Sequence, residues 1–181
     1  MDAPSLAASL QEAVPGASIE VVPSIDPQTT IYVPRDHVPA LARQLRGRAD
    51  LDFALLAELT AADFWPREPR FELVYILVSI AHRHRIRVKV RLRADEARVA
   101  TMTGVWPAAN WLEREVWDLF GIEFDGHPDP RRLLMPEDWD GFPLRKDYPV
   151  QIRKTPEYAE PLQVTADEFR QSVERDRLTR R

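Results

Sequence analysis

The chain has 181 residues, a formal net charge of −4 and no cysteine. The absence of cysteine excludes disulfides, Cys-ligated zinc or iron–sulfur clusters and thiol nucleophiles from this sequence. A hydrophobic content of 44% with 30% charged residues indicates a folded chain, and the length suits one domain with an extension.

No stretch of the sequence predicts a transmembrane helix. The longest apolar run covers residues 73–81 and contains one serine, whereas a membrane-spanning helix needs about 20 apolar residues. The N-terminal segment has no basic residue before Arg35, so it lacks the basic region that begins a secretory signal. We therefore expect a cytosolic chain, or one bound to the cytosolic face of a membrane.

The first fifty residues predict two helices and a hairpin. Residues 5–13 form the first predicted helix, and a Pro-Gly pair ends it. Short β-rich runs at residues 18–22 and 29–33 flank a turn rich in proline and aspartate, which favours a hairpin. Residues 36–46 are typical of an amphipathic helix. Its apolar face consists of Val38, Leu41, Ala42 and Leu45.

Three further stretches predict strands. Residues 51–59 are a mixed apolar run, and residues 71–81 are almost continuously apolar, which favours a strand buried on both faces. Residues 85–93 alternate between basic and apolar side chains, and this period of two predicts one buried face and one basic outer face. The inward set is Ile86, Val88, Val90 and Leu92, and the outward set is Arg87, Lys89, Arg91 and Arg93.

A third helix is predicted between Pro107, which suits a first helical turn, and Gly121, which suits a C-terminal cap. Its expected buried stripe is Ala108, Leu112, Val116, Leu119 and Phe120. Residues 1–126 are therefore predicted to form an α+β domain with a mostly antiparallel sheet covered by helices.

The pattern changes after Gly126. Seven of the 16 prolines fall within residues 127–164, a density that excludes a long helix or a central strand. Large apolar side chains in the same stretch argue against disorder. We expect an extended proline-rich arm that lies along its own domain and then wraps a partner. Residues 165–181 predict a short C-terminal helix, begun by a capping box of Thr165 and Glu168, and a basic tail.

Charged residues gather on the predicted third helix. Glu113, Glu115 and Asp118 could supply a general acid and a general base. Arg114 and Asp118 are also four residues apart, which is the spacing of an ordinary ion pair along a helix. We favour a structural or interfacial network over catalysis by this chain alone.

Several other motifs are ambiguous. His82 and His84 have the spacing of a two-ligand metal fragment, but a polar turn between strands explains them better. The basic face of residues 85–93 could grip phosphates, form a solvated sheet edge that deters aggregation, or dock an acidic partner. The tripeptide His-Pro-Asp at 127–129 also occurs in J-domain cochaperones, but the flanking helices typical of those proteins are not predicted here. The sequence contains no glycine-rich phosphate loop and no Gly-x-Ser-x-Gly elbow.

The segment 106–149 resembles the signature of the 30-kDa subunit of NADH-quinone oxidoreductase (respiratory complex I, or NDH-1), the subunit that is also designated C. The motifs that carry the resemblance are Glu-Arg-Glu at 113–115, Asp-Leu-Phe at 118–120, His127, Arg131, Leu133-Leu134 and Leu-Arg-Lys-Asp-Tyr-Pro at 144–149. The resemblance extends over about residues 30–150. Pro130 and Phe142 depart from it, since the family usually has leucine and histidine there, and Phe142 weakens any essential protonic role for that position.

The resemblance implies a non-catalytic subunit of the peripheral arm of the complex, with no cofactor-binding or metal-binding residue of its own. Its expected partners are the 49-kDa subunit (designated D), which helps to form the quinone pocket, and neighbouring cluster-bearing subunits. The assembled complex would pass electrons from NADH through FMN and iron–sulfur clusters to quinone, coupled to proton translocation. The implied location is the cytoplasmic side of a bacterial cell membrane, with membrane contact only through the complex and no nucleic-acid partner.

A partner interface is expected on the predicted third helix and the arm. Four basic residues are expected to pair with carboxylates of the partner: Arg131, Arg132, Arg145 and Lys146. Three apolar anchors are expected beside them, because aromatic residues carry much of the energy of an interface: Trp139, Leu144 and Tyr148. The complete expected interface is Glu113, Arg114, Glu115, Asp118, His127, Arg131, Arg132, Trp139, Leu144, Arg145, Lys146, Asp147 and Tyr148.

Two alternatives remain open. The same signature extends into related ferredoxin-fed dehydrogenases and membrane hydrogenases. An RNA-binding module that uses the basic strand is the alternative from a different class, although that strand offers no exposed aromatic side chains on which bases could stack.

Overall fold

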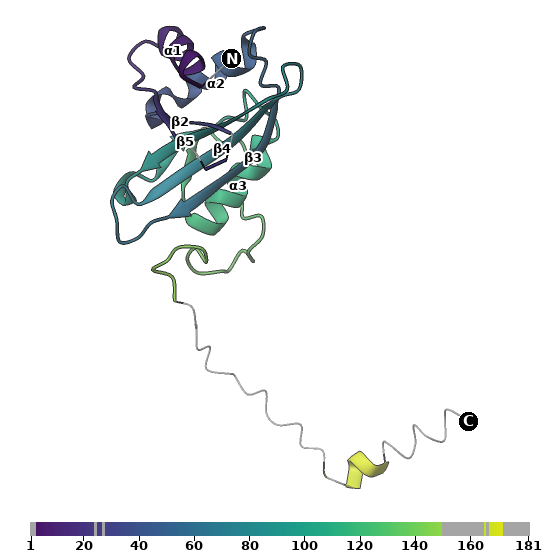
Figure 1. Cartoon of the computed structure of the whole chain (residues 1–181). Coiled ribbons are helices and arrows are strands. Elements are labelled where there is room, and N and C mark those ends of the chain that lie inside the picture. The colour runs from purple at the N-terminus through teal and green to yellow at the C-terminus, as the bar shows by residue number, and fades with distance from the viewer. Residues whose placement is uncertain (1–2, 24, 27, 150–164, 166, 172–181) are drawn as a thin grey trace, which may run out of the picture. The chain divides into compact units, whose positions relative to one another are not determined.

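A computed structural model of the chain describes residues 3–23, 25–26, 28–149, 165 and 167–171 (Figure 1). The chain divides into two units, Met1–Tyr148 and Pro149–Arg181, and the first of these carries the sheets and the long helices. Over the residues that are described, no helix is both long enough and apolar enough to cross a membrane.

The main sheet of the described chain has five strands in the spatial order β1-β2-β5-β4-β3 (Figure 1). Neighbouring strands are antiparallel except for β2 and β5, which are parallel. The strands are β1 (Glu20–Val22), β2 (Thr29–Tyr32), β3 (Leu55–Asp63), β4 (Phe71–Ser79) and β5 (His84–Leu92). The predicted α+β fold with a mostly antiparallel sheet is confirmed, as is the hairpin near its N-terminus.

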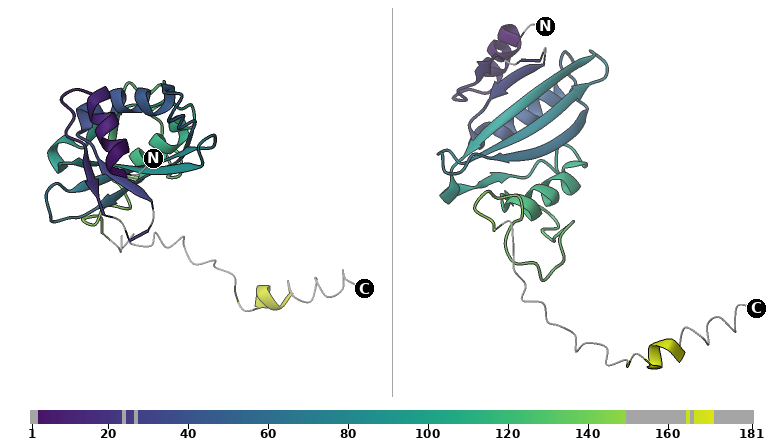
Figure 2. Two further views of the ribbon diagram at one scale, coloured as in Figure 1. Left: turned by 45° about the horizontal axis from the view of Figure 1, so that its top comes forward. Right: turned by 60° about the horizontal axis from the view of Figure 1, so that its bottom comes forward.

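The helices lie on one side of this sheet (Figure 2). They are α1 (Ala3–Ala13), the short 3-10 helix η1 (Arg35–His37), α2 (Val38–Gly47) and α3 (Ala109–Phe120). All four apolar residues predicted for the inner face of α2 are buried. They pack over the buried side of β4 and β5, so this helix closes the core above the central strands.

A second, two-stranded sheet joins the ends of α3 to the rest of the domain. It pairs β6 (Arg98–Ala100) with β7 (Glu123–Asp125) in parallel, and a short 3-10 helix, η2 (Ala94–Glu96), precedes it. The amide of Glu123 donates to the carbonyl of Ala97 at 2.9 Å, and the amide of Thr101 donates to that of Asp125 at 2.9 Å. These bonds hold the segment after α3 beside residues 97–101.

The alternation predicted for β5 is confirmed, but one expectation about the sheet and one of the alternatives left open for β5 are wrong. Side chains of β4 alternate between buried and half-buried, so this strand is not buried on both faces. The physical reason is that helices cover only one face of the sheet (Figure 2). Likewise β5 is not an edge, because β2 and β4 flank it.

The buried stripe predicted for α3 is also partly wrong. Val116 and Phe120 are buried, but Leu112 and Leu119 are only half-buried, and Ala108 is exposed ahead of the helix. The buried set of α3 is Ala109, Glu113, Arg114, Val116, Asp118 and Phe120. Arg114 and Asp118 join it because the arm packs on a second face of the helix, and Glu113 joins it because it binds Thr101 and Met102. The apolar periodicity reveals neither contact.

The compact unit includes residues 127–148, the first part of the expected arm. In the second unit, the amide of Thr165 donates to Glu168 Oε2 at 2.9 Å and the amide of Glu168 donates to Thr165 Oγ1 at 3.3 Å, which confirms the capping box. The rest of the expected arm and the basic tail lie outside the described residues.

Candidate docking site

Most of the expected interface residues lie where α3 meets residues 127–148. At the centre is Asp118, whose side chain is fully buried. Its Oδ2 accepts three backbone N–H bonds at 2.7–3.0 Å, from Leu133, Leu134 and Met135. Its Oδ1 accepts a bond of 2.6 Å from Arg132 Nη1. Burial alone would raise the pKa of Asp118, but these N–H groups and the guanidinium hold that pKa below its usual range.

We call Asp118, together with the groups of the arm that bind it, the Asp118 lock. Arg132 also binds the arm to itself, and Arg114 of α3 binds the arm as well. Arg132 Nη2 also donates to the carbonyls of Trp139 (2.9 Å) and Gly141 (3.3 Å). Arg114 donates to the carbonyls of Arg131 (3.0 Å) and Arg132 (2.9 Å). The ion pair expected between Arg114 and Asp118 along the helix is therefore wrong, because each side chain reaches across to the arm instead.

A second contact holds the later part of the arm. Arg145 Nε donates to the carbonyl of Phe120 at 2.5 Å, and the amide of Leu144 donates to the carbonyl of Leu119 at 3.0 Å. The guanidinium lies 4.6 Å from the ring centre of Phe142. Burial in these surroundings lowers the pKa of Arg145. Arg132 and Arg145 were both expected to meet carboxylates of a partner, but in this structure they bind groups of their own chain.

A third contact joins the arm to the turn between β3 and β4. Arg70 donates two hydrogen bonds to Asp63 (3.0 and 2.8 Å) and two to Asp147 (2.9 and 2.6 Å). The amide of Lys146 donates to Asp63 Oδ2 at 2.9 Å. Burial would raise the pKa of Asp63, yet the Arg70 guanidinium and the two backbone amides lower it to about 2.

Asp63 and Arg70 were not expected from the sequence to belong to the site. The available signal was that opposite charges stand at positions 63 and 70, between two predicted strands, with nothing in the sequence to show that they meet. Their third partner, Asp147, was expected at the interface as part of the signature. We call Asp63, Arg70 and Asp147 the clamp.

The N-terminal half of α3 holds a different kind of carboxyl group. Glu113 is fully buried and accepts hydrogen bonds from Thr101 Oγ1 (2.5 Å) and from the amide of Met102 (2.6 Å). Burial raises the pKa of Glu113 to about 7, and the two hydrogen bonds only partly oppose this rise.

His127 lies 3.9 Å from this carboxyl but does not neutralise it. Its Nε2 donates to the carbonyl of Asn110 at 3.0 Å, and its Nδ1 accepts the amide of Asp129 at 3.0 Å. One ring nitrogen must carry a hydrogen and the other must not, so these bonds select the neutral ring. Glu113 therefore has hydrogen-bond donors beside it but no cation.

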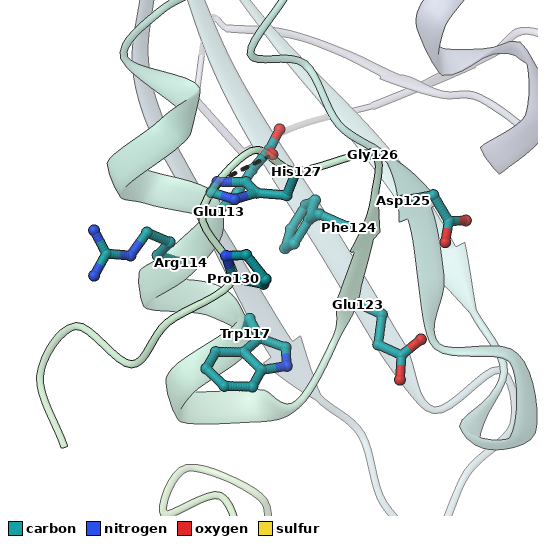
Figure 3. Close-up of a pocket in the computed structure, with 9 residues that line it drawn as sticks. All are labelled: Glu113, Arg114, Trp117, Glu123, Phe124, Asp125, Gly126, His127 and Pro130. Carbon is teal, nitrogen blue, oxygen red and sulfur yellow. Dashed lines mark ion pairs between the residues drawn. The ribbon is translucent and has the colours of Figure 1, made fainter. Parts of the chain in front are cut away.

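A pocket of about 400 Å³ lies between α3, β7 and the start of the arm (Figure 3). Its lining residues are Glu113, Arg114, Trp117, Glu123, Phe124, Asp125, Gly126, His127 and Pro130. The rings of Trp117, Phe124 and Pro130 face the cavity, and the carboxyl of Glu113 lies on the far side of His127 (Figure 3). Across the described part of the chain, no group of three or more His, Asp or Glu side chains is placed to hold a metal.

The remaining expected residues are more exposed. Arg131 pairs with Asp129 at 2.6 Å while 74% of its side chain stays exposed. Trp139 stacks on Tyr148, with ring centres 6.4 Å apart. Lys146 and Leu144 are exposed and Glu115 is half-buried. These exposed side chains are the ones that a partner could meet without displacing the arm.

The basic outer face of β5 is largely neutralised within the chain. Lys89 lies 2.7 Å from Glu72, Arg87 lies 2.8 Å from Asp26, and Arg91 lies 3.4 Å from Glu20. Since each of these cations already has a carboxylate partner, the face is poorly suited to binding phosphates. This weakens the RNA-binding alternative.

The fold and the docked arm define a class of protein: a small α+β domain in which helix α3 holds the segment 127–148 that follows it. The chain belongs to the family described as "Respiratory-chain NADH dehydrogenase, 30 Kd subunit", which it matches over residues 31–154. The NADH-quinone oxidoreductase subunit designated C of Roseiflexus sp. (strain RS-1) is 45% identical to it over 121 residues, which cover 67% of this chain and 70% of that protein.

Further relatives extend the comparison. The NADH-quinone oxidoreductase subunit designated C/D of Methylococcus capsulatus is 39% identical over 147 residues, which cover 77% of this chain and 25% of that protein. Among solved structures, a trypsin-resistant fragment of Nqo5 gives a TM-score of 0.55 at 34% identity, covering 68% of this chain and 98% of the fragment. A chain of the membrane-bound sulfane sulfur reductase, an archaeal respiratory membrane complex, gives 0.64 at 27% identity, covering 91% and 96%. The resemblance to the 30-kDa subunit is confirmed.

Proposed function

We propose that this chain is a non-catalytic peripheral subunit of a proton-translocating NADH-quinone oxidoreductase, in which it braces the quinone-reducing subunit. The observation that carries the proposal is the family match over residues 31–154, because it includes all of α3, the Asp118 lock and the clamp. The electron carriers of the complex, FMN, iron–sulfur clusters and quinone, would belong to other subunits.

The principal partner in this proposal is the 49-kDa subunit. Support comes from the relative in Methylococcus capsulatus, whose designation C/D joins the 30-kDa and 49-kDa subunits in one protein. Neighbouring cluster-bearing subunits would be further partners. The chain would reach the cytoplasmic side of the membrane only through the complex.

The role proposed for the site is to give the arm a fixed shape before it meets the partner. Arg132, Arg145 and Asp147 are already bound within the domain, so binding would not have to order these residues. Direct contacts would then come from exposed side chains such as Arg131, Leu144 and Lys146, and from the part of the arm beyond the described residues.

The test is affinity capture from membranes of the source cell with a tag on this chain. We expect the captured material to oxidise NADH, to contain iron–sulfur clusters and to include the 49-kDa subunit by mass spectrometry. An untagged strain is the control. Captured chain that brings down neither NADH-oxidising activity nor the 49-kDa subunit would refute the proposal.

A second candidate function is membership of a related respiratory complex with another electron donor. The observation that favours it is the TM-score of 0.64 to a chain of the archaeal sulfane sulfur reductase, over 91% of this chain. The captured complex distinguishes the two candidates. Reduction of its iron–sulfur clusters by NADH supports the first, whereas reduction of these clusters by reduced ferredoxin but not by NADH supports the second.

A further inference from the structure

Two aromatic side chains are exposed at the turn between β3 and β4. Phe64 is 39% exposed and its neighbour Trp65 is 50% exposed. Leu144 of the arm is 51% exposed. Large apolar side chains that gather on a surface mark contact sites more often than scattered single ones do.

The clamp brings these two segments, far apart in sequence, to one place. Asp63 Oδ1 accepts the amide of Trp65 at 2.9 Å, and Asp63 Oδ2 accepts the amide of Lys146 at 2.9 Å. One carboxylate therefore binds the backbone of both the turn and the arm. The exposed side chains of Trp65 and Lys146 project from a shared support.

This support is stiff. The side chains of Asp63 and Arg70 are 1% and 9% exposed, and Arg70 makes paired hydrogen bonds to both Asp63 and Asp147. A planar guanidinium bound at both edges fixes orientation as well as distance. A surface held in this way loses little conformational entropy when a partner binds.

We propose that Phe64, Trp65, Leu144 and Lys146 form a docking surface for the 49-kDa subunit, with the aromatic turn as an anchor separate from the arm. We name it the turn–arm surface. The inference rests on the proposed function and deepens it, because it adds to the interface a part of the sheet domain that the signature does not include.

The choice of occupant follows from where the compact unit ends. That unit ends at Tyr148, two residues after Lys146, and a further 33 residues form the second unit, Pro149–Arg181. The relative designated C/D carries both subunits in one polypeptide, and the match to this chain covers 25% of it. This covalent link favours a 49-kDa partner at the end of the 30-kDa fold, and the turn–arm surface lies at that end.

The chain offers a matched control at the other end of the same hairpin. Ile80 is 69% exposed in the turn after β4, whereas Trp65 precedes that strand. A strand of this length separates the two positions by about 30 Å. Both are exposed apolar residues in turns, so a general effect of surface hydrophobicity would affect both alike.

The first experiment is photo-crosslinking in the assembled complex, with Trp65 or Ile80 replaced by the photoreactive residue p-benzoylphenylalanine. We expect position 65 to crosslink to the 49-kDa subunit, identified by mass spectrometry, and position 80 not to. A crosslink from position 65 only to a second copy of this chain or to another subunit, or no crosslink at all, would overturn the inference.

The second experiment compares capture of the 49-kDa subunit by charged variants. The double variant Trp65→Asp, Leu144→Asp should lower the captured amount at least about tenfold, while Ile80→Asp should leave it unchanged. Circular dichroism of each purified chain confirms that it is folded. Retention of the 49-kDa partner by a folded double variant would overturn the inference. Failure of the unmodified chain to capture an NADH-oxidising assembly would instead refute the proposed function, so the two failures are distinguishable.

Discussion

The two fully buried carboxyl groups of α3, Glu113 and Asp118, lie five residues apart and respond to burial in opposite ways. Asp118 meets the guanidinium of Arg132 and three backbone amides, and its pKa is lowered. Glu113 meets a hydroxyl, one amide and a neutral histidine, and its pKa is raised to about 7. The comparison shows that burial disfavours the charged form of both groups, and that the backbone amides and the guanidinium supplied by the arm keep Asp118 charged.

The largest effect is expected from Asp118→Asn, which removes the charge and nearly keeps the shape. Arg132 would be left partly buried without its counter-ion, so the free energy of unfolding should fall by about 4 kcal/mol. Urea titration followed by tryptophan fluorescence measures the change, and trypsin should cut faster after Arg132. Glu115→Gln on the same helix is the control and should change stability by less than about 0.5 kcal/mol. Equal losses of unfolding free energy in the two variants would show that the contacts of Asp118 stabilise the chain no more than those of Glu115 do.

Glu113→Gln tests the other member of the pair through its pH dependence. Because the folded state raises the pKa of Glu113 from 4.5 to about 7, folding favours its protonated form. That contribution is fully present below pH 4.5, is lost as the pH rises toward 7, and amounts to about 3 kcal/mol.

The glutamine variant should lack this decline, since its amide stays neutral and can bond both Thr101 and Met102. Urea titrations at pH 5 and pH 8 measure the difference between variant and unmodified chain. For Asp118 the sign is opposite, because its pKa is lowered: its contribution is present above pH 3.8 and is lost as the pH falls further. An unmodified chain equally stable at pH 5 and pH 8 would contradict the raised pKa of Glu113.

Arg70→Lys extends the comparison to a third carboxylate, Asp63, which the clamp also keeps charged. A lysine ammonium cannot form paired bonds to Asp63 and Asp147 at once, so we expect a loss of about 2 kcal/mol in unfolding free energy. Faster trypsin cleavage after Lys146 is the second readout. Arg43→Lys, at an exposed site on α2, is the control and should leave both readouts unchanged.

The sequence predicted those parts of the fold that depend on a local period or a single residue. The alternation of β5 and the apolar face of α2 are local patterns, and both are confirmed. The partners of Asp118 could not be predicted in this way. Helical spacing pointed to Arg114, whereas the real partner, Arg132, lies 14 residues after Asp118 in a stretch without any period.

The contacts of the expected interface residues were therefore not predicted. Asp118, Arg132, Arg145 and Asp147 were all expected at a partner interface, yet in the structure each of them binds groups of its own chain. Their intramolecular contacts depend on how the arm folds back, and this is set by long-range packing. The clamp partner Arg70 carried no motif at all.

Gly121→Ala should have the smallest of these effects. Gly121 is the helix cap that the sequence predicted, and it also lies against the arm, a contact that the sequence did not predict. Gly121 ends α3 with φ +71°, which a side chain disfavours, and a Cβ there would lie 2.5 Å from both Arg145 Nη2 and Phe142 Cε2. We expect a loss of about 1.5 kcal/mol from backbone strain and from displacement of the arm. Gly104→Ala is the control, because a Cβ at that position would meet nothing within 4 Å. If Gly121→Ala costs stability but leaves trypsin cleavage after Arg145 unchanged, the glycine is needed only as a helix cap. Faster cleavage would show that the helix end and the arm form one packed unit.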